Sequence, residues 1–230
     1  MNARLVSCIL PTFNSQAYLR EALDSISAQT YHPIEIIVAD DGSSDQTRQM
    51  AQSYEHALNW VEQNSLGPAA TRNLGLRAAH GEFVSWLDPD DLWHPEKLAR
   101  QMACFDARED LQACITHVQI LWTDPATAKR YQDHPRSGPV PGYATISLLA
   151  RRTVFDLVGD FDTSLWFSDA ADWFLRAAER GVVLQVLPDA LVYHRMHGAN
   201  LTRRREELSR HEFLKLVKAS LDRRRARLSS

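Results

Sequence analysis

Residues 82–91, EFVSWLDPDD, run from an apolar segment directly into a cluster of carboxylates. The apolar part has the length and composition of a buried strand, and the acidic part follows its carboxyl end. Two or three carboxylates in one loop can hold a hard divalent cation through oxygen, and Mg²⁺ or Mn²⁺ fits best. The same carboxylates could instead cap a helix that begins near His94, and this stretch alone does not separate the two interpretations.

Similar strand patterns precede this stretch. Residues 5–10 and 34–39 form short apolar runs, and apolar side chains between them recur at the three- and four-residue spacing of a helix. Such alternation predicts an α/β fold with a mainly parallel central sheet and helices on both faces. Ligands of these sheets bind beyond the carboxyl ends of the strands. Asp40, Asp88 and Asp90 all follow predicted strands, so we expect their carboxylates to meet around one cation at that edge.

The second half of the chain is less regular. Six Pro and Gly residues between positions 123 and 142 predict a long loop there. The remaining patterns predict helices at 95–108, 152–158 and 169–180, and strands at 113–122 and 182–187. A basic segment follows these elements.

The composition narrows the class of protein. With 230 residues and 44% hydrophobic side chains the chain can bury a sizeable core, and a formal net charge of −3 gives no general reason to expect a nucleic-acid partner. The 3 cysteines form no closely spaced pair, which favours a reducing compartment over a disulfide or zinc framework. No stretch reaches the roughly 20 apolar residues of a membrane span, and Pro11 comes too early for a signal peptide. We expect a soluble, cytoplasmic protein.

Four segments, in this order and spacing, resemble the family 2 glycosyltransferases of the GT-A fold. They are VSCILPTFN at 6–14, DDGSSD at 40–45, GPAATRN at 67–73 and LDPDD at 87–91. Taken singly they are weaker: DDGSSD could be only a turn between a strand and a helix, and GPAATRN lacks the spacing of a dinucleotide-binding motif. The resemblance is specific over residues 5–100, weaker to about 202, and absent beyond.

The resemblance implies a Rossmann-like GT-A fold and an inverting transfer of a sugar from a nucleoside diphosphate donor to an acceptor hydroxyl. Residues 1–202 would form one domain, with a nucleotide-binding half at 1–100 and an acceptor-side half at 101–202. A UDP-sugar is the favoured donor. The acceptor is open, and both lipid-linked and glycan acceptors fit the family.

Each matching residue carries an implied role in the nucleotide pocket. Pro11, Thr12 and Asn14 would line the pocket, and Asp40 would hydrogen-bond the base. Arg72 would close the pocket. These roles come from the resemblance, because the residue types alone would equally suit turns.

The acidic loop and a late histidine carry the implied metal site. Asp88 would face the ribose and the sugar, whereas Asp90 would bind a Mn²⁺ or Mg²⁺ ion that bridges the two phosphates of the donor. Asp91 would support the site. His197 could approach the metal or the diphosphate, although a histidine after a strand is also a common hydrogen-bonded surface group.

The segment ADWFLR at 171–176 resembles the family motif on the acceptor side and makes Asp172 the candidate base. The family commonly has an acidic residue where this chain has Ala171, and Asp169 lies close enough to compete in the alignment. Asp172 could also be only a carboxylate near a helix N-terminus. Three aromatic residues nearby could stack on a sugar or belong to the core: Trp166, Phe167 and Trp173.

Two other functions use similar parts. A nucleotidyltransferase would also need a nucleotide-binding sheet and metal-binding aspartates, but it requires a basic residue beside the triphosphate, and Arg4 precedes the first strand instead of following it. A non-catalytic module that binds sugar nucleotides would explain Ala171. The three functions differ in the product released.

Residues 203–230 predict a basic amphipathic helix, with arginines at 203–205 and 223–225. Its apolar residues at roughly helical spacing are Leu208, Leu214, Val217 and Leu221. One interpretation is docking at the inner face of an anionic membrane, where lipid-linked acceptors would lie. The favoured interpretation is that the apolar stripe packs on this domain, or on a second copy in a homodimer, with the arginines in solvent.

Overall fold

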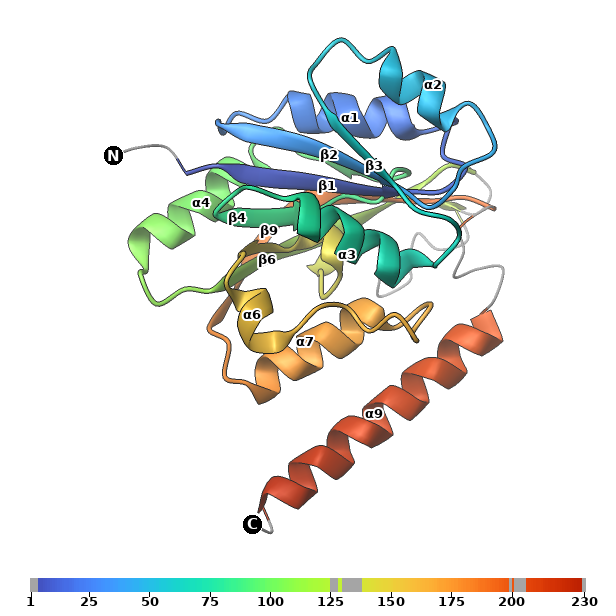
Figure 1. The fold of residues 1–230 in the computed structure, drawn as a ribbon. Coiled ribbons are helices and arrows are strands. Elements are labelled where there is room, and N and C mark those ends of the chain that lie inside the picture. The colour runs from blue at the N-terminus through green and yellow to red at the C-terminus, as the bar shows by residue number, and fades with distance from the viewer. Residues whose placement is uncertain (1–3, 125–127, 130–137, 199, 201–205, 229–230) are drawn as a thin grey trace.

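The structure of the protein is a computed structural model, and it describes residues 4–124, 128–129, 138–198, 200 and 206–228. Its strands are β1 (Val6–Thr12), β2 (Ile34–Asp40), β3 (Asn59–Glu62), β4 (Phe83–Trp86), β5 (Leu92–Trp93), β6 (Ala113–Trp122), β7 (Val140–Pro141), β8 (Leu149–Arg151) and β9 (Leu184–Met196). Its helices are α1 (Leu19–Ser27), α2 (Thr47–Gln52), α3 (Pro68–Ala78), α4 (Lys97–Ala107), the 3₁₀ turn η1 (Thr145–Ser147), α6 (Val154–Val158), α7 (Asp169–Glu179) and α9 (Glu206–Leu228). Figure 1 shows their arrangement.

The described strands form one mixed sheet in the order β3-β2-β1-β4-β8-β6-β9-β5, with β7 beside β6. The pairs β1–β2, β2–β3, β1–β4 and β6–β9 are parallel. Because β4 and β6 both run opposite to β8, they point the same way. The carboxyl ends of β1, β2, β4, β6 and β9 therefore share one edge of the sheet. The α/β fold class is confirmed, and the antiparallel pairs all involve the less regular β5, β7 and β8.

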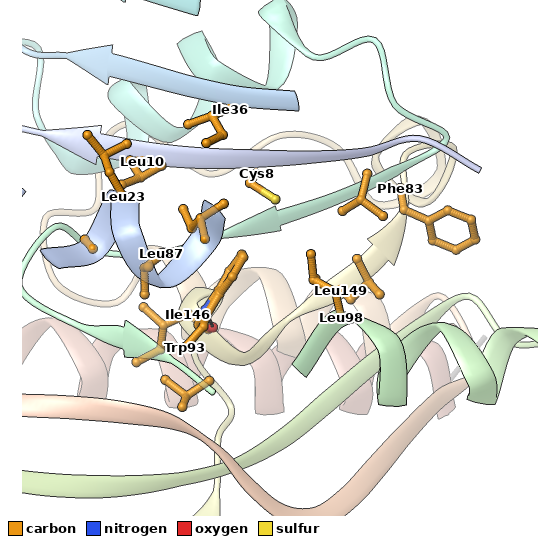
Figure 2. Close-up of a cluster of buried hydrophobic side chains, with 14 of the residues drawn as sticks. Cys8, Leu10, Leu23, Ile36, Phe83, Leu87, Trp93, Leu98, Ile146 and Leu149 are labelled. Atoms are coloured by element: carbon orange, nitrogen blue, oxygen red, sulfur yellow. Dashed lines mark hydrogen bonds between the residues drawn. The ribbon is translucent and has the colours of Figure 1, made fainter. Parts of the chain in front are cut away.

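Helices cover both faces of the sheet (Figure 1). Successive residues of β1 alternate between the faces. Cys8 and Leu10 pack in one core with Leu23 of α1 and Leu98 of α4, whereas Ile9 packs in a second core with α3, α6 and α7. Figure 2 shows the first core. The central strands are thus buried on both sides, which holds the loops at their carboxyl ends in place.

One strand is much longer than its pattern predicts. The pattern places a strand at 182–187 that stops before Pro188, whereas β9 continues to Met196. The register against β6 shifts on both sides of His117, so Pro188 lies in an irregularity and removes no regular ladder hydrogen bond. The additional length carries the residues after Pro188 to the same edge of the sheet as the acidic loop.

The predicted loop at 123–142 lies partly outside the described residues. At its described end, Val140 and Pro141 pair with β6. The helices predicted at 95–108, 152–158 and 169–180 are present with slightly shorter bounds.

The C-terminal helix forms as predicted, but a different face contacts the domain. α9 lies beside α7. The predicted packing of the leucine stripe on this domain was wrong, since Leu208, Leu214 and Leu221 are exposed, and Leu216 and Ser220 are buried instead. Contact of that stripe with a membrane or a second copy stays a prediction. Within the described part of the chain, no helix has the length and apolar character needed to cross a bilayer.

The contact between α3 and β1 yields a stability prediction. Gly75 lies so close to β1 that a Cβ there would come 2.3 Å from Cγ2 of Ile9, which is fully buried and β-branched. Gly75→Ala should lower the free energy of unfolding by about 1–2 kcal/mol in urea denaturation, because overpacking outweighs the higher helix propensity of alanine. Gly138→Ala is the control, since a Cβ there meets nothing within 4 Å. Equal unfolding free energies for the two variants would contradict the packing argument.

Candidate functional site

A hydrogen-bonded turn joins the carboxyl ends of β1 and β2. Thr12 and Asp40 are paired residues of the two strands, and Thr12 Oγ1 donates to Asp40 Oδ1 at 3.1 Å. Asp40 also accepts from the N–H of Gly42 at 3.1 Å and from the N–H and hydroxyl of Ser43 at 2.8 and 2.5 Å. Gly42 has a φ of 82°, which favours glycine. The structure brings Thr12 and Asp40 together, with both Asp40 oxygens engaged in the turn.

A second contact ties the loops after β1 and β2. Asn14 has a left-handed φ of 49°, its Oδ1 accepts from the N–H of Ser44 at 2.8 Å, and its own N–H donates to Ser43 Oγ at 2.8 Å. Pro11 lies nearby in β1 and is half-buried. Phe13 is 55% exposed in the same loop. The sequence predicted no site role for Phe13, although Phe13 lies inside the segment 6–14 that resembles the family.

Asp41 is a structural residue that the sequence analysis also missed. Its Oδ1 accepts from Gln63 Nε2 and from the N–H of Leu66, each at 2.8 Å, and its Oδ2 accepts from the N–H of Gly67 at 2.9 Å. Gly67 has a φ of 93° and is the N-cap of α3. Asp41 therefore fixes the start of the helix that carries Arg72.

The guanidinium of Arg72 links two carboxylates from distant parts of the chain. Nη1 donates to Asp169 Oδ2 at 2.6 Å and Nη2 donates to Asp88 Oδ1 at 3.2 Å. The side chains of Arg72 and Asp169 are 12% and 5% exposed, whereas Asp88 is 33% exposed. Burial opposes the charge of Arg72, but the two carboxylates raise its pKa above the ordinary value, so it stays charged. Its Nε is buried and has no hydrogen-bond partner among the described residues.

The two predicted metal ligands lie together. Nε2 of His197 is 3.0 Å from Asp90 Oδ2, and Asn200 Nδ2 donates to the same oxygen at 3.0 Å. The His197 ring also stacks on Tyr18, with the ring centroids 4.8 Å apart. His197 directly follows β9, so the parallel pairing of β9 with β6 delivers it to the edge that holds Asp90. Asn200 is a neighbour for which the sequence predicted no role.

Beside this pair, Asp91 fastens β9 to the acidic loop. It is fully buried, lies 2.9 Å from Nδ1 of His194, and accepts from the N–H of Arg195 at 2.9 Å. Burial raises the pKa of Asp91 to about 6, against the opposing effect of His194. Burial opposes protonation of His194, but Asp91, with Asp90 and Asp88, raises its pKa to about 9. Near neutral pH both partners are therefore charged.

The described residues offer a metal ion two side chains and no larger cluster. No group of three or more His, Cys, Asp or Glu residues with a metal-binding arrangement occurs in the described part of the chain. Asp90 and His197 contribute one oxygen and one nitrogen, which fits an ion that takes its other ligands from substrate phosphates and water. The expectation that Asp40 shares a cation with Asp88 and Asp90 was wrong, because the turn holds both oxygens of Asp40.

The two carboxylates at the start of α7 have different partners. Asp169 pairs with Arg72, whereas Asp172 Oδ2 accepts from Nε of Arg176 at 2.6 Å. Nη1 and Nη2 of Arg176 in turn donate to the carbonyls of Val158 and Asp160 at 2.6 and 2.8 Å. Asp172 therefore fastens α7 to the segment after α6. The structure brings Asp169 to Arg72, and Asp172 as the base stays a prediction.

The three aromatic residues that could stack on a sugar differ in burial. Trp173 is fully buried and stacks on Phe155 at 4.9 Å, so it belongs to the core. Trp166 is 45% exposed and Phe167 is partly exposed. Both line a groove of about 410 Å³ between the segment before α7 and α9. Of the three, only these two could meet a ligand.

Comparison with known families matches residues 7–162 to "Glycosyl transferase family 2". The chain belongs to this family. A curated relative of the family 2 chain, an uncharacterized glycosyltransferase of Rickettsia typhi, is 32% identical over 212 residues, which cover 86% of this chain. The chain spans 66% of the length of that relative.

Two solved structures share the fold. Residues 1–349 of TarS from S. aureus, in complex with UDP, match with a TM-score of 0.68 and 25% identity, covering 83% of this family 2 chain and 60% of that one. The mannosyltransferase PcManGT from Pyrobaculum calidifontis, in complex with GDP-Man and Mn²⁺, matches with a TM-score of 0.72 and 23% identity, covering 95% and 65%. The second likeness shows the fold alone.

Proposed function

We propose that the chain is a metal-dependent glycosyltransferase that moves a sugar from a nucleoside diphosphate donor to an acceptor hydroxyl. The observation that carries the proposal is the meeting of Arg72, Asp88 and the Asp90–His197 pair at the carboxyl edge of the sheet. A charged guanidinium and a metal-binding pair are the groups that recognise a diphosphate. Support comes from structures of similar fold that hold UDP or GDP-Man with Mn²⁺.

The nucleoside would lie over the loops after β1 and β2. Pro11, Thr12 and Asn14 would form the wall of the pocket, and Asp40 would hydrogen-bond the base in exchange for one of its contacts in the turn. The exposed ring of Phe13 offers a surface on which the base could stack. A UDP-sugar is the first donor to test, since the similar TarS structures hold UDP and UDP-GlcNAc, and GDP-mannose is the second.

The diphosphate would lie between Arg72 and the acidic loop. Asp90 and His197 would hold Mn²⁺ or Mg²⁺, which when bound stabilises the charge that develops on the leaving diphosphate. Asp88, the most exposed carboxylate in contact with Arg72, would face the ribose and the sugar. Asp91 would keep the loop in register with β9 through His194 and Arg195.

A base must accept the proton of the acceptor hydroxyl as that oxygen attacks the anomeric carbon with inversion. We propose Asp169 for this role, because Arg72 connects it to Asp88, whereas Asp172 pairs with Arg176 on the side of α6. Asp172 is the alternative that the motif favours. The acceptor would approach from the side of α7 and the groove lined by Trp166.

The two rival functions have less support. In a nucleotidyltransferase a basic residue would have to face the triphosphate, but Arg4 pairs with Asp106 at the opposite end of β1. A non-catalytic module would bind a sugar nucleotide without releasing a diphosphate. Diphosphate release therefore separates the transferase from both rivals.

The metal assignment is tested by Asp90→Ala. Release of nucleoside diphosphate from a panel of UDP- and GDP-sugars with Mn²⁺ should fall on the order of 100-fold or more. Without Asp90 the metal ion that stabilises the charge on the leaving diphosphate would be held less well. Asp110→Ala is the control, since this exposed carboxylate pairs only locally with Arg108. Unchanged release in Asp90→Ala would rule out the assignment. Pyrophosphate release from a nucleoside triphosphate by the wild type would instead support a nucleotidyltransferase.

The base assignment is tested by comparing Asp169→Asn with Asp172→Asn. Asp169→Asn should lower transfer by about 10²–10⁴-fold, while Mn²⁺-dependent binding of UDP or GDP persists in the folded protein. It should also lower the unfolding temperature, because the buried Arg72 loses a charged partner. Asp172→Asn should act mainly on stability, through the lost pairing with Arg176, and keep a much larger share of the transfer rate. Thermal unfolding and single-turnover transfer measure the two effects. Loss of transfer in a fully folded Asp172→Asn protein would instead identify Asp172 as the catalytic base.

A further inference from the structure

A carboxylate of α9 binds the backbone just before α7. Oε1 of Glu212 accepts from the N–H groups of Phe167 and Ser168 at 2.8 and 2.7 Å, and Oε2 accepts from the N–H of Trp166 at 3.1 Å. Ser168 is the N-cap of α7, and its own side chain makes no capping hydrogen bond. Glu212 thus supplies the negative charge that a helix N-terminus favours. Charge-assisted hydrogen bonds of this kind are stronger than neutral ones, so one side chain fixes three successive residues.

The segment held by Glu212 borders the proposed donor site. Asp169 directly follows Ser168 and accepts from Arg72. Trp166 packs beside Gly67, where a Cβ would lie 3.4 Å from the indole ring, and Gly67 begins the helix that carries Arg72. Movement of this segment would therefore move both the proposed base and the aromatic wall of the acceptor side.

A second glutamate ties the same two helices at their other ends. Glu179, the last residue of α7, accepts from Ser220 Oγ at 2.7 Å and from Nε and Nη2 of Arg223 at 2.9 and 3.1 Å. Each tie therefore contains three hydrogen bonds to one glutamate. The tie at Glu179 lies at the opposite end of α7 from Asp169, which makes it a matched control for the tie at Glu212.

We propose that Glu212 is a positioning residue for sugar transfer. By fixing residues 166–168 it holds Asp169 against Arg72 and keeps Trp166 at the acceptor side, so it acts through these two residues. The assignment rests on the proposed function, and it concerns residues beyond position 162, where the family match ends. Release of the segment would let the base sample many positions, and small misplacements of a reacting group cost large factors in rate.

The test compares Glu212→Ala with Glu179→Ala in the full chain. Both variants lose three hydrogen bonds, so both should lower the unfolding temperature by similar amounts. Glu212→Ala should lower turnover about tenfold or more, measured as nucleoside diphosphate release from the UDP- and GDP-sugar panel with Mn²⁺. Binding of UDP or GDP with Mn²⁺ should stay within about threefold of wild type, because Glu212 hydrogen-bonds residues 166–168 and not the residues proposed to hold the diphosphate and the metal. Glu179→Ala should keep turnover within about twofold.

Hydrogen exchange gives a readout that needs no substrate. In Glu212→Ala, the amides of residues 166–168 should exchange about tenfold faster or more, whereas in Glu179→Ala faster exchange should be confined to the adjoining ends of α7 and α9. Glu212→Gln retains one acceptor oxygen and should fall between wild type and Glu212→Ala in both exchange and turnover.

Three outcomes would overturn the proposal: unchanged exchange at 166–168 in Glu212→Ala, equal turnover losses in the two alanine variants, or a loss of nucleotide binding in Glu212→Ala as large as its loss of turnover. If the wild-type protein releases no diphosphate from any donor, the proposed function is contradicted, and not the role of Glu212. In that case the exchange data alone decide whether Glu212 holds the segment.

Discussion

The buried pairing of Arg72 with Asp88 and Asp169 is the constraint on which the site depends. It joins α3 to the loop after β4 and to the first residue of α7, so it connects both halves of the chain. Removing either carboxylate would leave a buried charge less compensated, which is strongly unfavourable. The arrangement of the surrounding loops follows from this requirement: Asp41 fixes the start of α3, and Glu212 fixes the segment before Asp169.

Where a role depends on neighbours along the chain, the sequence predicts it well. The strands around Leu10 and Asp40, and the turn at Gly42, follow from local apolar runs and turn residues, and the structure shows them close to the predicted positions. The acidic loop also follows its strand as predicted. The proposed metal ligands Asp90 and His197 were reached together only through the family resemblance, since they are 107 positions apart. They meet because the strands before them run in the same direction and end at one edge of the sheet.

Where a role depends on which groups meet across the fold, the local sequence pattern did not predict it. The strand predicted at 182–187 ends before Pro188, but this proline lies in an irregularity of the sheet and β9 continues to Met196. Asp169 and Asp172 lie three positions apart on one helix, and only the tertiary contacts show that the first meets Arg72 and the second Arg176. The leucines of α9 have helical spacing, yet Leu216 is buried whereas Leu214 and Leu221 are exposed. Helical spacing alone does not show which face of α9 contacts the domain.

The site is proposed to bind one kind of ligand: a nucleoside diphosphate whose phosphates meet Arg72 and a cation held by Asp90 and His197. Isothermal titration of the wild-type protein with UDP and with GDP, with Mn²⁺ and again with excess chelator, tests it most directly. We expect saturable binding of one of the two nucleotides, and this binding should weaken about tenfold or more when the metal is removed. Absence of binding to either nucleotide with Mn²⁺ present, in a folded protein, would contradict it.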